Sequence, residues 1–567
     1  MNKKLRSFLP IITPQITVSD MKSIPANLSS ILFCLAVITH QTPWPVALLL
    51  FSLSSFFAFS LNYWLVPGGF AWRNHHDNQK PSRFRGPIGW PIVGTLPQMG
   101  SLAHRKLASM AASLGATKLM AFSLGSTRVI ISSHPDTARE ILCGCSFADR
   151  PIKESARLLM FERAIGFAPS GDYWRHLRRI AANYMFSPRN ISALEPLRQR
   201  LANEMVAEVR EEMKERRVVE LRDILQKGSL SNVLESVFGS DVSIEREELG
   251  FMVKEGFDLI AKFNLDDYFP LRFLDFNGVK RRCCKLAGKV NSVVGQIVKE
   301  RKGAGDSRSG SDSFLSALLS LPEEDQLKES DMVALLWDQM EKIFDSMCQE
   351  DLTGMILLWD NVTQEMIFRG TDTVALLLEW IMARMVGHPE IQAKAQEELD
   401  TCIGSHREVQ DSDIPNLPYL RAIVKEVLRL HPPGPLLSWA RLAIHDVHVD
   451  KTFIPAGTTV MVNMWAITHD PSIWRDPWVF NPDRFIEEDV LIMGSDLRLA
   501  PFGAGRRVCP GKALGLATVH LWLARLLHEY RWLPAKPVDL SECLRLSLEM
   551  KRPLECHVVQ RRSKVTQ

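Results

Sequence analysis

The chain lacks the features that mark nucleic-acid-binding, disordered or repeat proteins. Its 567 residues include 68 lysines and arginines against 65 aspartates and glutamates, and the basic residues are dispersed rather than gathered in one tract. A net charge of +3 excludes a binding mode that depends on a strong basic surface. Hydrophobic residues make up 46% of the chain, enough to bury a large core. We find no repeats, and residues 303–313 form the one low-complexity stretch, which we expect to be an exposed loop.

Cysteines are few and do not follow the spacing of zinc ligands. There are ten of them, and none forms a Cys-x-x-Cys pair. The nearest neighbours in sequence are Cys143 with Cys145 and Cys283 with Cys284, which lack the usual zinc spacing. We therefore expect a reducing compartment, without a disulfide framework and without zinc.

Charged residues are absent between Lys22 and Arg73. Within this interval Val46–Val66 is an apolar run, which as a helix spans about 30 Å, the thickness of one hydrocarbon core. The run predicts a single transmembrane helix, although the similar numbers of Lys and Arg on its two sides give no orientation. The alternatives are a buried core helix or a cleaved presequence, since residues 1–44 contain Ser and Thr and almost no acid, as plastid and mitochondrial transit peptides do.

The remainder of the chain predicts one mainly helical domain. Residues 81–100 contain several prolines and glycines, which favour an extended, stiff path between anchor and domain. Alternating apolar residues on both sides of Gly125 and Ser126 predict a β-hairpin, whereas most later segments have helical periodicity. We divide the chain into an N-terminal segment with anchor and hinge, 1–80, and a catalytic domain, 81–567.

One cysteine, Cys509, lies between a glycine-rich loop and an apolar helix in residues 500–530. Pro510 suits a first helical turn, which places the thiol at a helix N-terminus, where unpaired N–H groups and the helix dipole favour the metal-binding thiolate. The neighbouring residues suggest a flat cofactor: three glycines would allow close approach of the backbone, an aromatic ring would pack on its face and an arginine would reach an acidic edge. These residues are Gly503, Gly505, Gly511, Phe502 and Arg507.

This string resembles the haem signature of cytochromes P450, Phe-x-x-Gly-x-Arg-x-Cys-x-Gly, and the resemblance extends over most of the chain from Pro81 onward. A lone cysteine beside glycine would otherwise be a buried thiol. The resemblance implies the cytochrome P450 fold, mainly α with small β-sheets, preceded by the transmembrane helix. It also implies haem b with Cys509 as axial thiolate ligand of the iron, a ligand that favours O–O cleavage.

Further motifs strengthen the resemblance. Glu426 and Arg429 lie three residues apart on one helical face, where a surface ion pair would be unremarkable. With Arg484 in the later Pro-Asp-Arg-Phe string, they resemble the Glu-x-x-Arg pair and arginine partner that brace the core of a P450. Their implied role is structural.

A second group of basic residues resembles the haem-propionate ligands of the family. Trp174 and Arg178 match a Trp-x-x-x-Arg helix, and Arg441 is a further candidate by its placement. For Arg175 and Arg179 we favour a solvated face of the helix, which could dock an acidic reductase.

The oxygen-handling motif is expected in the helix that contains Gly370, Asp372, Thr373 and Leu377. Gly370 would leave room for dioxygen, the Thr373 hydroxyl would donate a hydrogen bond to the bound oxygen, and Asp372 would relay protons. The pair resembles the acid–alcohol pair of P450 monooxygenases. A helix cap or an incidental polar patch is the alternative.

Other strings, among them FRGTDT and FNLDDYFPL, resemble the plant seventy-eighth P450 family, subfamily A, of the KLUH or plastochron type. The resemblance implies hydroxylation of a fatty acid or related lipid-derived molecule in organ-growth control. Phe368, Leu436 and Leu437 are the implied pocket residues, although ordinary core packing would use the same side chains. The implied partners are NADPH–cytochrome P450 reductase, membrane lipid, O2 and a small apolar substrate. The implied location is the endoplasmic reticulum membrane with a cytosolic catalytic domain, and a plastid is the alternative.

Residues 338–364 depart from the family pattern, which passes from a Leu-Leu-Trp segment almost directly into Met366-Ile367-Phe368. As continuous helix they would add about 40 Å to an element that already crosses the domain. We interpret them as a retained intron or a mis-joined gene model, and a looped-out insertion is the alternative. A real insertion would favour a second function, a haem-binding but catalytically impaired protein.

Overall fold

The computed structural model describes residues 45–46, 48–49, 52–56, 66–73, 84–159, 165–240, 251–252, 255–256, 259, 278–289, 313–319, 361–437 and 440–561, with only the backbone at 156, 319 and 361–371. No helix within these ranges is both long and apolar enough to cross a membrane. Most of Val46–Val66, the stretch 303–312 and residues 338–360 lie outside the described ranges. The anchor, the exposed loop and the insertion therefore stay predictions.

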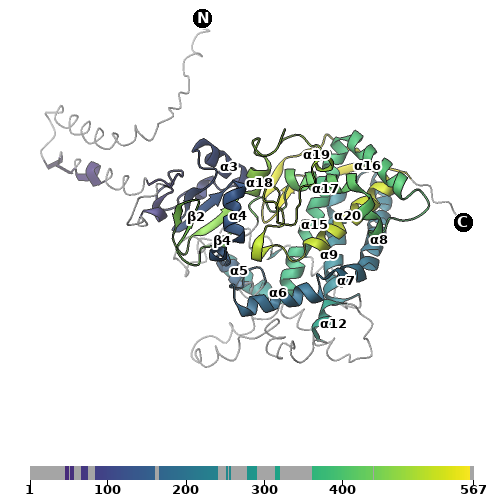
Figure 1. Cartoon of the computed structure of the whole chain (residues 1–567), viewed down its shortest axis with the longest axis horizontal. Helices are drawn as coiled ribbons and strands as arrows, with labels where there is room; N and C mark the ends of the chain where they lie inside the picture. Colours follow the sequence, from purple (N-terminus) through teal and green to yellow (C-terminus); the bar gives the residue numbers. More distant parts are fainter. Residues whose placement is uncertain are drawn as a thin grey trace, which may run out of the picture.

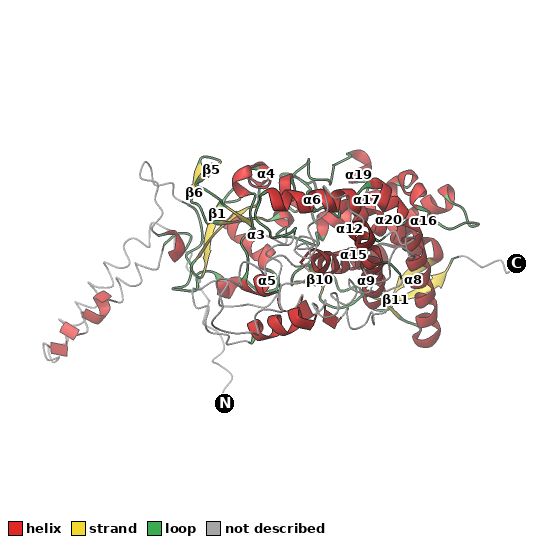
Figure 2. Ribbon diagram, turned by 90° about the horizontal axis from the view of Figure 1, so that it is seen from below, coloured by secondary structure: helices red, strands yellow, loops and turns green. Residues whose placement is uncertain are grey.

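The described residues are mainly helical with small sheets, as predicted (Figures 1 and 2). The α-helices are α3 (Ala103–Ser113), α4 (Pro135–Cys143), α5 (Glu154–Leu158), α6 (Asp172–Tyr184), α7 (Pro188–Ala193), α8 (Glu195–Arg216), α9 (Leu221–Phe238), α12 (Phe314–Leu319), α15 (Asn361–Gly387), α16 (Pro389–Cys402), α17 (Pro418–Leu430), α18 (Met464–Thr468), α19 (Arg484–Glu487) and α20 (Lys512–Glu529). Short 3-10 turns are η2 (Phe70–Trp72), η3 (Leu96–Gln98), η4 (Cys145–Phe147), η8 (Asp411–Asn416) and η9 (Gly505–Arg507).

The strands form four small sheets. One has the order β1-β2-β7-β4, one β3-β11-β8, and two are hairpins, β5-β6 and β10-β9. The strands are β1 (Met120–Leu124), β2 (Thr127–Ser132), β3 (Val219–Glu220), β4 (Arg441–Leu442), β5 (Val447–Val449), β6 (Thr452–Ile454), β7 (Thr459–Val462), β8 (Tyr530–Pro534), β9 (Glu542–Leu544), β10 (Leu548–Met550) and β11 (Glu555–Gln560). β1 and β2 pair antiparallel across Gly125 and Ser126, so the predicted hairpin is confirmed.

α15 is the central helix of the largest core. It packs against α9, α17 and α20, and in Figure 1 these helices lie together in the right half of the molecule. Trp380 of α15, Trp522 of α20 and Trp532 of β8 are among the largest fully buried side chains. Their burial removes much apolar surface from water and holds the backbone of the central helices in place.

Side chains from neighbouring helices fix the ends of several elements. The carboxylate of Glu398 on α16 accepts from the backbone N–H groups of Tyr419 and Leu420 at 2.7 and 2.9 Å, and so satisfies donors that the first turn of α17 leaves unpaired. The Ser187 hydroxyl accepts from the N–H of Asn190 and caps α7 in the usual local manner. These bonds fix the start of α17 against α16, and the later part of α17 places Glu426 and Arg429 in the core.

Candidate functional site

Cys509 lies in a tight loop just before α20. The chain turns through η9, and the backbone N–H of Cys509 donates to the carbonyl oxygen of Phe502 at 3.0 Å. Because this bond keeps Cys509 in the loop, α20 starts only at Lys512, with Gly511 as N-cap. The prediction that Pro510 lies in the first helical turn is therefore wrong by two residues. Cys509 is half-buried, and the half-buried Phe502 packs against the largest core.

The three loop glycines have different roles. Gly503 and Gly505 have φ angles of 70° and 66°, the left-handed region that favours glycine. A Cβ on Gly505 would lie 2.2 Å from the Leu142 carbonyl oxygen of α4, and one on Gly511 would lie 3.2 Å from the Phe186 ring. A Cβ on Gly503 would meet no atom within 4 Å. The expectation that all three glycines approach a flat ligand stays a prediction, and Gly505 also lies close to α4.

Three arginines converge on this loop from different elements. Arg178 of α6 donates to the Val508 carbonyl oxygen at 2.9 Å, and Arg441 of β4 donates to the Ala504 carbonyl oxygen at 3.3 Å. Arg507 of the loop itself donates to the carbonyl oxygens of residues 148, 165 and 168, and lies 3.8 Å from the Asp149 carboxylate. The structure therefore brings together the three cations that the sequence analysis named separately.

Trp174 lies beneath these guanidinium groups. Its ring centroid is 4.2 Å from the Arg507 guanidinium and 5.6 Å from that of Arg178, which are cation–π distances. Its indole N–H donates to the Ile165 carbonyl oxygen at 2.9 Å. Trp174 thus supports the arginines, while its one polar hydrogen is already engaged with the backbone.

The electrostatics of this arginine group fit an anionic ligand. Burial, followed by the positive charges of Arg507 and Arg178, lowers the pKa of Arg441 to about 10. A nearby carboxylate would favour the charged guanidinium and offset this mutual repulsion. Haem has two propionate groups, and the open space beside Gly503 leaves room next to the cysteine loop. The residues present therefore fit haem, with Arg178 and Arg441 as the candidate propionate ligands.

Asp372 and Thr373, the predicted oxygen-handling residues, lie on α15 just before its buried part. Asp372 is half-buried and Thr373 is exposed, whereas Leu377, one turn later, is only 4% exposed. α15 packs against α20, the helix that follows the Cys509 loop. Gly370 and Phe368 belong to the part of α15 whose backbone alone is described, and the pocket candidates Leu436 and Leu437 are half-buried.

Glu426, Arg429 and Arg484 form the predicted structural brace. The two side chains of the Glu426–Arg429 pair are 0% exposed and bond at 2.8 Å, so this is a buried pair and not a surface one. Arg484 donates to the same carboxylate at 3.2 Å. Arg429 also donates to the carbonyl oxygens of Thr468 and Pro477, which links α17 to the end of α18 and to the segment after it.

The other two arginines of α6 point outward, as expected. The Arg175 side chain is 59% exposed and bonds Asp172 at 2.5 Å, and Arg179 bonds His176 at 2.9 Å. These local pairs lie on the same short helix as Arg178. α6 therefore has one face toward the cysteine loop and one toward solvent.

Sequence reasoning missed Asp149. Its carboxylate accepts from the Ser170 backbone N–H at 2.6 Å and faces Arg507, while its carbonyl oxygen accepts from the Leu442 N–H of β4 at 2.9 Å. Asp149 thus links the loop arginine to the strand that holds Arg441. No spacing pattern in the sequence points to it, because all three contacts are made to distant segments.

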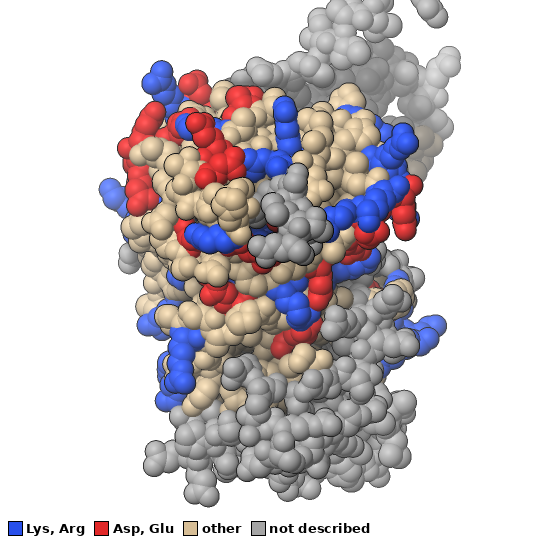
Figure 3. All heavy atoms as spheres, turned by 90° about the vertical axis from the view of Figure 1, so that its right-hand side faces the viewer, with Lys and Arg blue, Asp and Glu red and all other residues tan. Residues whose placement is uncertain are grey.

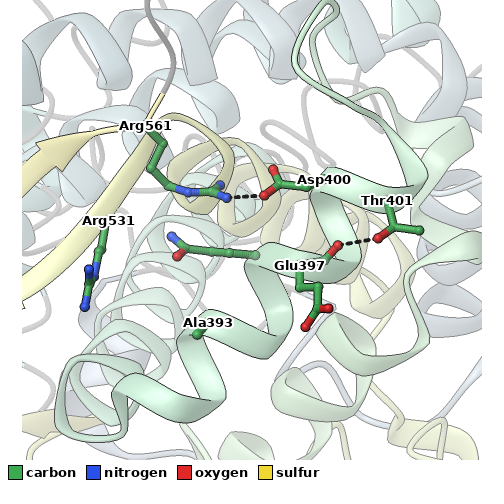
Figure 4. A pocket seen from close by; sticks show the side chains of 7 residues that line it. Ala393, Glu397, Asp400, Thr401, Arg531 and Arg561 are labelled. Atoms are coloured by element: carbon green, nitrogen blue, oxygen red, sulfur yellow. Dashed lines mark hydrogen bonds and ion pairs between the residues drawn. The ribbon is translucent and has the colours of Figure 1, made fainter.

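A polar surface groove lies apart from the cysteine loop, between α16, β8 and the end of β11. Figure 4 shows the Arg561 guanidinium bonded to Asp400 at 2.6 Å and Arg531 on the neighbouring strand. On the face in Figure 3, acidic and basic side chains are both widely distributed. None of the residues that line this groove comes from α6, β4, α15 or the cysteine loop.

Comparison with known proteins gives a consistent set of relatives. The family model for Cytochrome P450 matches residues 84–555. The chain is 49% identical over 513 residues to cytochrome P450 78A3 of Glycine max, covering 88% of this chain and 92% of that protein. It is 48% identical over 539 residues to cytochrome P450 78A9 of Arabidopsis thaliana, covering 92% and 95%. It is also 32% identical over 498 residues to flavonoid 3'-monooxygenase of Arabidopsis thaliana, covering 85% and 92%.

Proposed function

Because the chain belongs to the cytochrome P450 family and to its 78A group, we propose that it hydroxylates a fatty acid or a related lipid-derived molecule, with Cys509 as the thiolate ligand of its haem. The family itself makes the protein a haem-thiolate monooxygenase. Haem, when bound, supplies the activation of O2. The proposal concerns which residues hold it and which substrate is used.

The observation that carries the proposal is the convergence of Arg178, Arg441 and Arg507 on the Cys509 loop. Arg178 and Arg441 would bind the propionates, and Arg507, on Trp174, would keep the loop in position. The loop then presents the Cys509 sulfur beside the start of α20, where the helix dipole favours a thiolate.

Asp372 and Thr373 would handle protons. The Thr373 hydroxyl is suited to donate a hydrogen bond, and the half-buried Asp372 carboxyl beside it is suited to exchange protons with solvent. Leu436 and Leu437, both half-buried, would contact an alkyl chain through dispersion and the exclusion of water.

The proposed electron donor is NADPH–cytochrome P450 reductase, and the solvent-facing cations of α6 would attract an acidic partner. The proposed location is the endoplasmic reticulum membrane, with Val46–Val66 as a single anchor and the catalytic domain in the cytosol. Salt extraction of microsomes from a host that expresses the full chain tests the anchor: the protein should stay in the membrane pellet, and release into the supernatant would refute it.

The full chain, reconstituted with reductase and NADPH, tests the function against a panel of fatty acids of different lengths. We expect hydroxylated products by mass spectrometry and a thiolate-type carbon monoxide difference spectrum. Cys509→Ala should abolish both, whereas Cys402→Ala, at an exposed thiol on α16, should change neither. Thr373→Val should keep NADPH consumption but lower the product formed per NADPH. Equal activity of C509A and the parent would refute the ligand, and a lack of product from every fatty acid would refute the substrate class.

A further inference from the structure

A buried polar cluster outside the haem site joins the second half of α15 to the end of α17. His431, the C-cap of α17, is 4% exposed, and its ring is stacked on the Trp380 indole with centroids 3.9 Å apart and an interplanar angle of 5°. Arg384, one turn beyond Trp380, directs both Nε and Nη2 at His431 Nε2, at 2.9 and 2.8 Å. Two side chains of α15 therefore contact the His431 imidazole: Trp380 stacks on its face, and Arg384 donates to its edge.

The contacts fix the tautomer of His431. A nitrogen that accepts from a guanidinium has no proton of its own, so the proton of the neutral ring is on Nδ1. Burial, together with the charge of Arg384, lowers the pKa of His431 well below its usual value, which agrees with a neutral ring. The Nδ1 atom faces Glu542 Oε2 at 3.9 Å, too long for a direct hydrogen bond.

The same cluster reaches the β9–β10 hairpin. Glu542 at the start of β9 bonds His104 at 2.8 Å and is also paired with Arg105, both on α3. Leu548 of β10 donates its N–H to the Pro433 carbonyl oxygen at 2.9 Å and accepts from the Trp380 indole N–H at 3.0 Å. β10 and α15 also appear close together in Figure 2, and their contact is direct. Trp380 thus binds the hairpin with its edge and His431 with its face.

The segment after His431 contains the two candidate pocket leucines. Leu437 has a φ of 52°, a strained conformation for leucine that persists only where the surroundings impose it. Bonds of Pro433 to the hairpin and of Pro435 to the Trp465 N–H, at 2.9 and 3.1 Å, hold this segment in place. Leu436 packs against the core around β1 and β2, and Leu437 against the core around α4 and β7.

We propose that Trp380, Arg384 and His431 form a positioning clamp that sets residues 432–437 relative to α15, and so determines which carbon of the substrate is hydroxylated. The inference rests on the proposed function, in which Leu436 and Leu437 contact the substrate. Thr373, Trp380 and Arg384 all lie on α15. If residues 432–437 move relative to this helix, the two leucines place a different carbon of the alkyl chain near Thr373. The three residues act through the leucines and do not touch the substrate.

The test uses the full chain with reductase, NADPH and a fatty acid that the parent hydroxylates. Arg384→Met removes the donor without leaving a buried charge, and Arg384→Met combined with His431→Phe keeps the ring over Trp380 and leaves no polar atom of either side chain unpaired. The control is His528→Phe, at a buried histidine near the end of α20 whose Nε2 contacts the Gly404 carbonyl oxygen. A carbon monoxide spectrum of each variant reports retained thiolate-bound haem.

We expect both clamp variants to keep the haem spectrum and to change the ratio of hydroxylated positions by about two- to tenfold, the range that the net free energy of one hydrogen bond allows. Amide exchange should rise at Gly434, Leu436 and Leu437 and in residues 544–550, and the control should match the parent in both readouts. Unchanged product ratios, even with raised exchange, would reduce the clamp to a structural contact and overturn the proposal. If the parent itself produces nothing from any fatty acid, the substrate class fails alone; the exchange measurement then tests whether the clamp holds the segment, and unchanged exchange refutes it.

Discussion

The Arg178 guanidinium of α6 donates to the carbonyl oxygen of Val508 at 2.9 Å across 330 residues of sequence, directly beside Cys509. This bond joins the helix that would bind a haem propionate to the loop that would bind the iron. One side chain can thereby hold both the edge of the cofactor and the backbone next to its axial ligand. A change at Arg178 would therefore alter both the conformation of the Cys509 loop and the positive charge that faces the propionate.

Arg178→Met should weaken haem retention. The substitution removes a charged hydrogen bond, for which a net value of about 1.5–3 kcal/mol is typical, so haem affinity should fall by at least about tenfold. Transfer of haem to apomyoglobin measures the loss rate. Arg175→Met, on the exposed side of the same helix, is the matched control and should leave the rate unchanged. Equal loss rates for the two variants would contradict the role of Arg178.

Glu426→Gln should strongly destabilise the domain. Glu426 and Arg429 are fully buried, and the substitution leaves two arginines facing a neutral amide. The loss of one partner of such a pair costs about 3 to 5 kcal/mol. Urea unfolding followed by circular dichroism measures the change. Glu211→Gln, in a pair whose two side chains are 62% exposed, should cost less than about 1 kcal/mol, and similar losses for both variants would reject the brace.

The sequence was sufficient for features encoded over short distances. The β1–β2 hairpin follows from alternation around Gly125, and the Glu426–Arg429 pair from its spacing on a helix. The fold class and the cysteine loop followed from a motif of fixed spacing. These predictions depend on neighbours in the chain, which periodicity and motif matching can detect.

Contacts between distant segments could not be predicted in this way. Asp149 with Arg507, and Arg384 with His431, come from different elements, and no local pattern marks either pair. The close approach of Gly505 to the Leu142 carbonyl oxygen of α4 is a further contact that the sequence around the loop does not indicate. The haem-propionate role of Trp174 remains a prediction, since its N–H bonds a backbone carbonyl.

Gly505→Ala should disrupt the cysteine loop in two ways, through the strain of a left-handed backbone conformation and through a clash of the new Cβ with α4. The new Cβ would lie 2.2 Å from the Leu142 carbonyl oxygen, so η9 and α4 must separate. Gly404→Ala is the matched control, because Gly404 has a similar φ of 74° and open space around it. The control should lose only about 1–2 kcal/mol from left-handed strain. Thermal unfolding and haem content should both fall further in G505A, and equal behaviour of the two variants would show that the contact with α4 is dispensable.

Three histidines with lowered pKa values, the buried His431 and His469 and the half-buried His520, predict a loss of stability in mild acid. Burial is the main cause that lowers the pKa of His469 to about 3, that of His520 to about 4, and that of His431 well below its usual value. In the unfolded chain the pKa of each histidine is about 6.5. Below that pH the unfolded state therefore binds more protons than the folded state. The stability from the neutral rings is therefore complete above about pH 6.5 and declines as the pH falls toward the folded-state values.

His469→Phe isolates one of these contributions. A single group with these two pKa values should lower the free energy of unfolding by about 2 kcal/mol between pH 7 and pH 5. The variant cannot take up that proton, so its loss over the same interval should be smaller than that of the parent by this amount. Urea unfolding at both pH values gives the difference, in which the titration of carboxylates common to both proteins cancels. An identical pH dependence of parent and variant would mean that the pKa of His469 is not lowered in the folded protein.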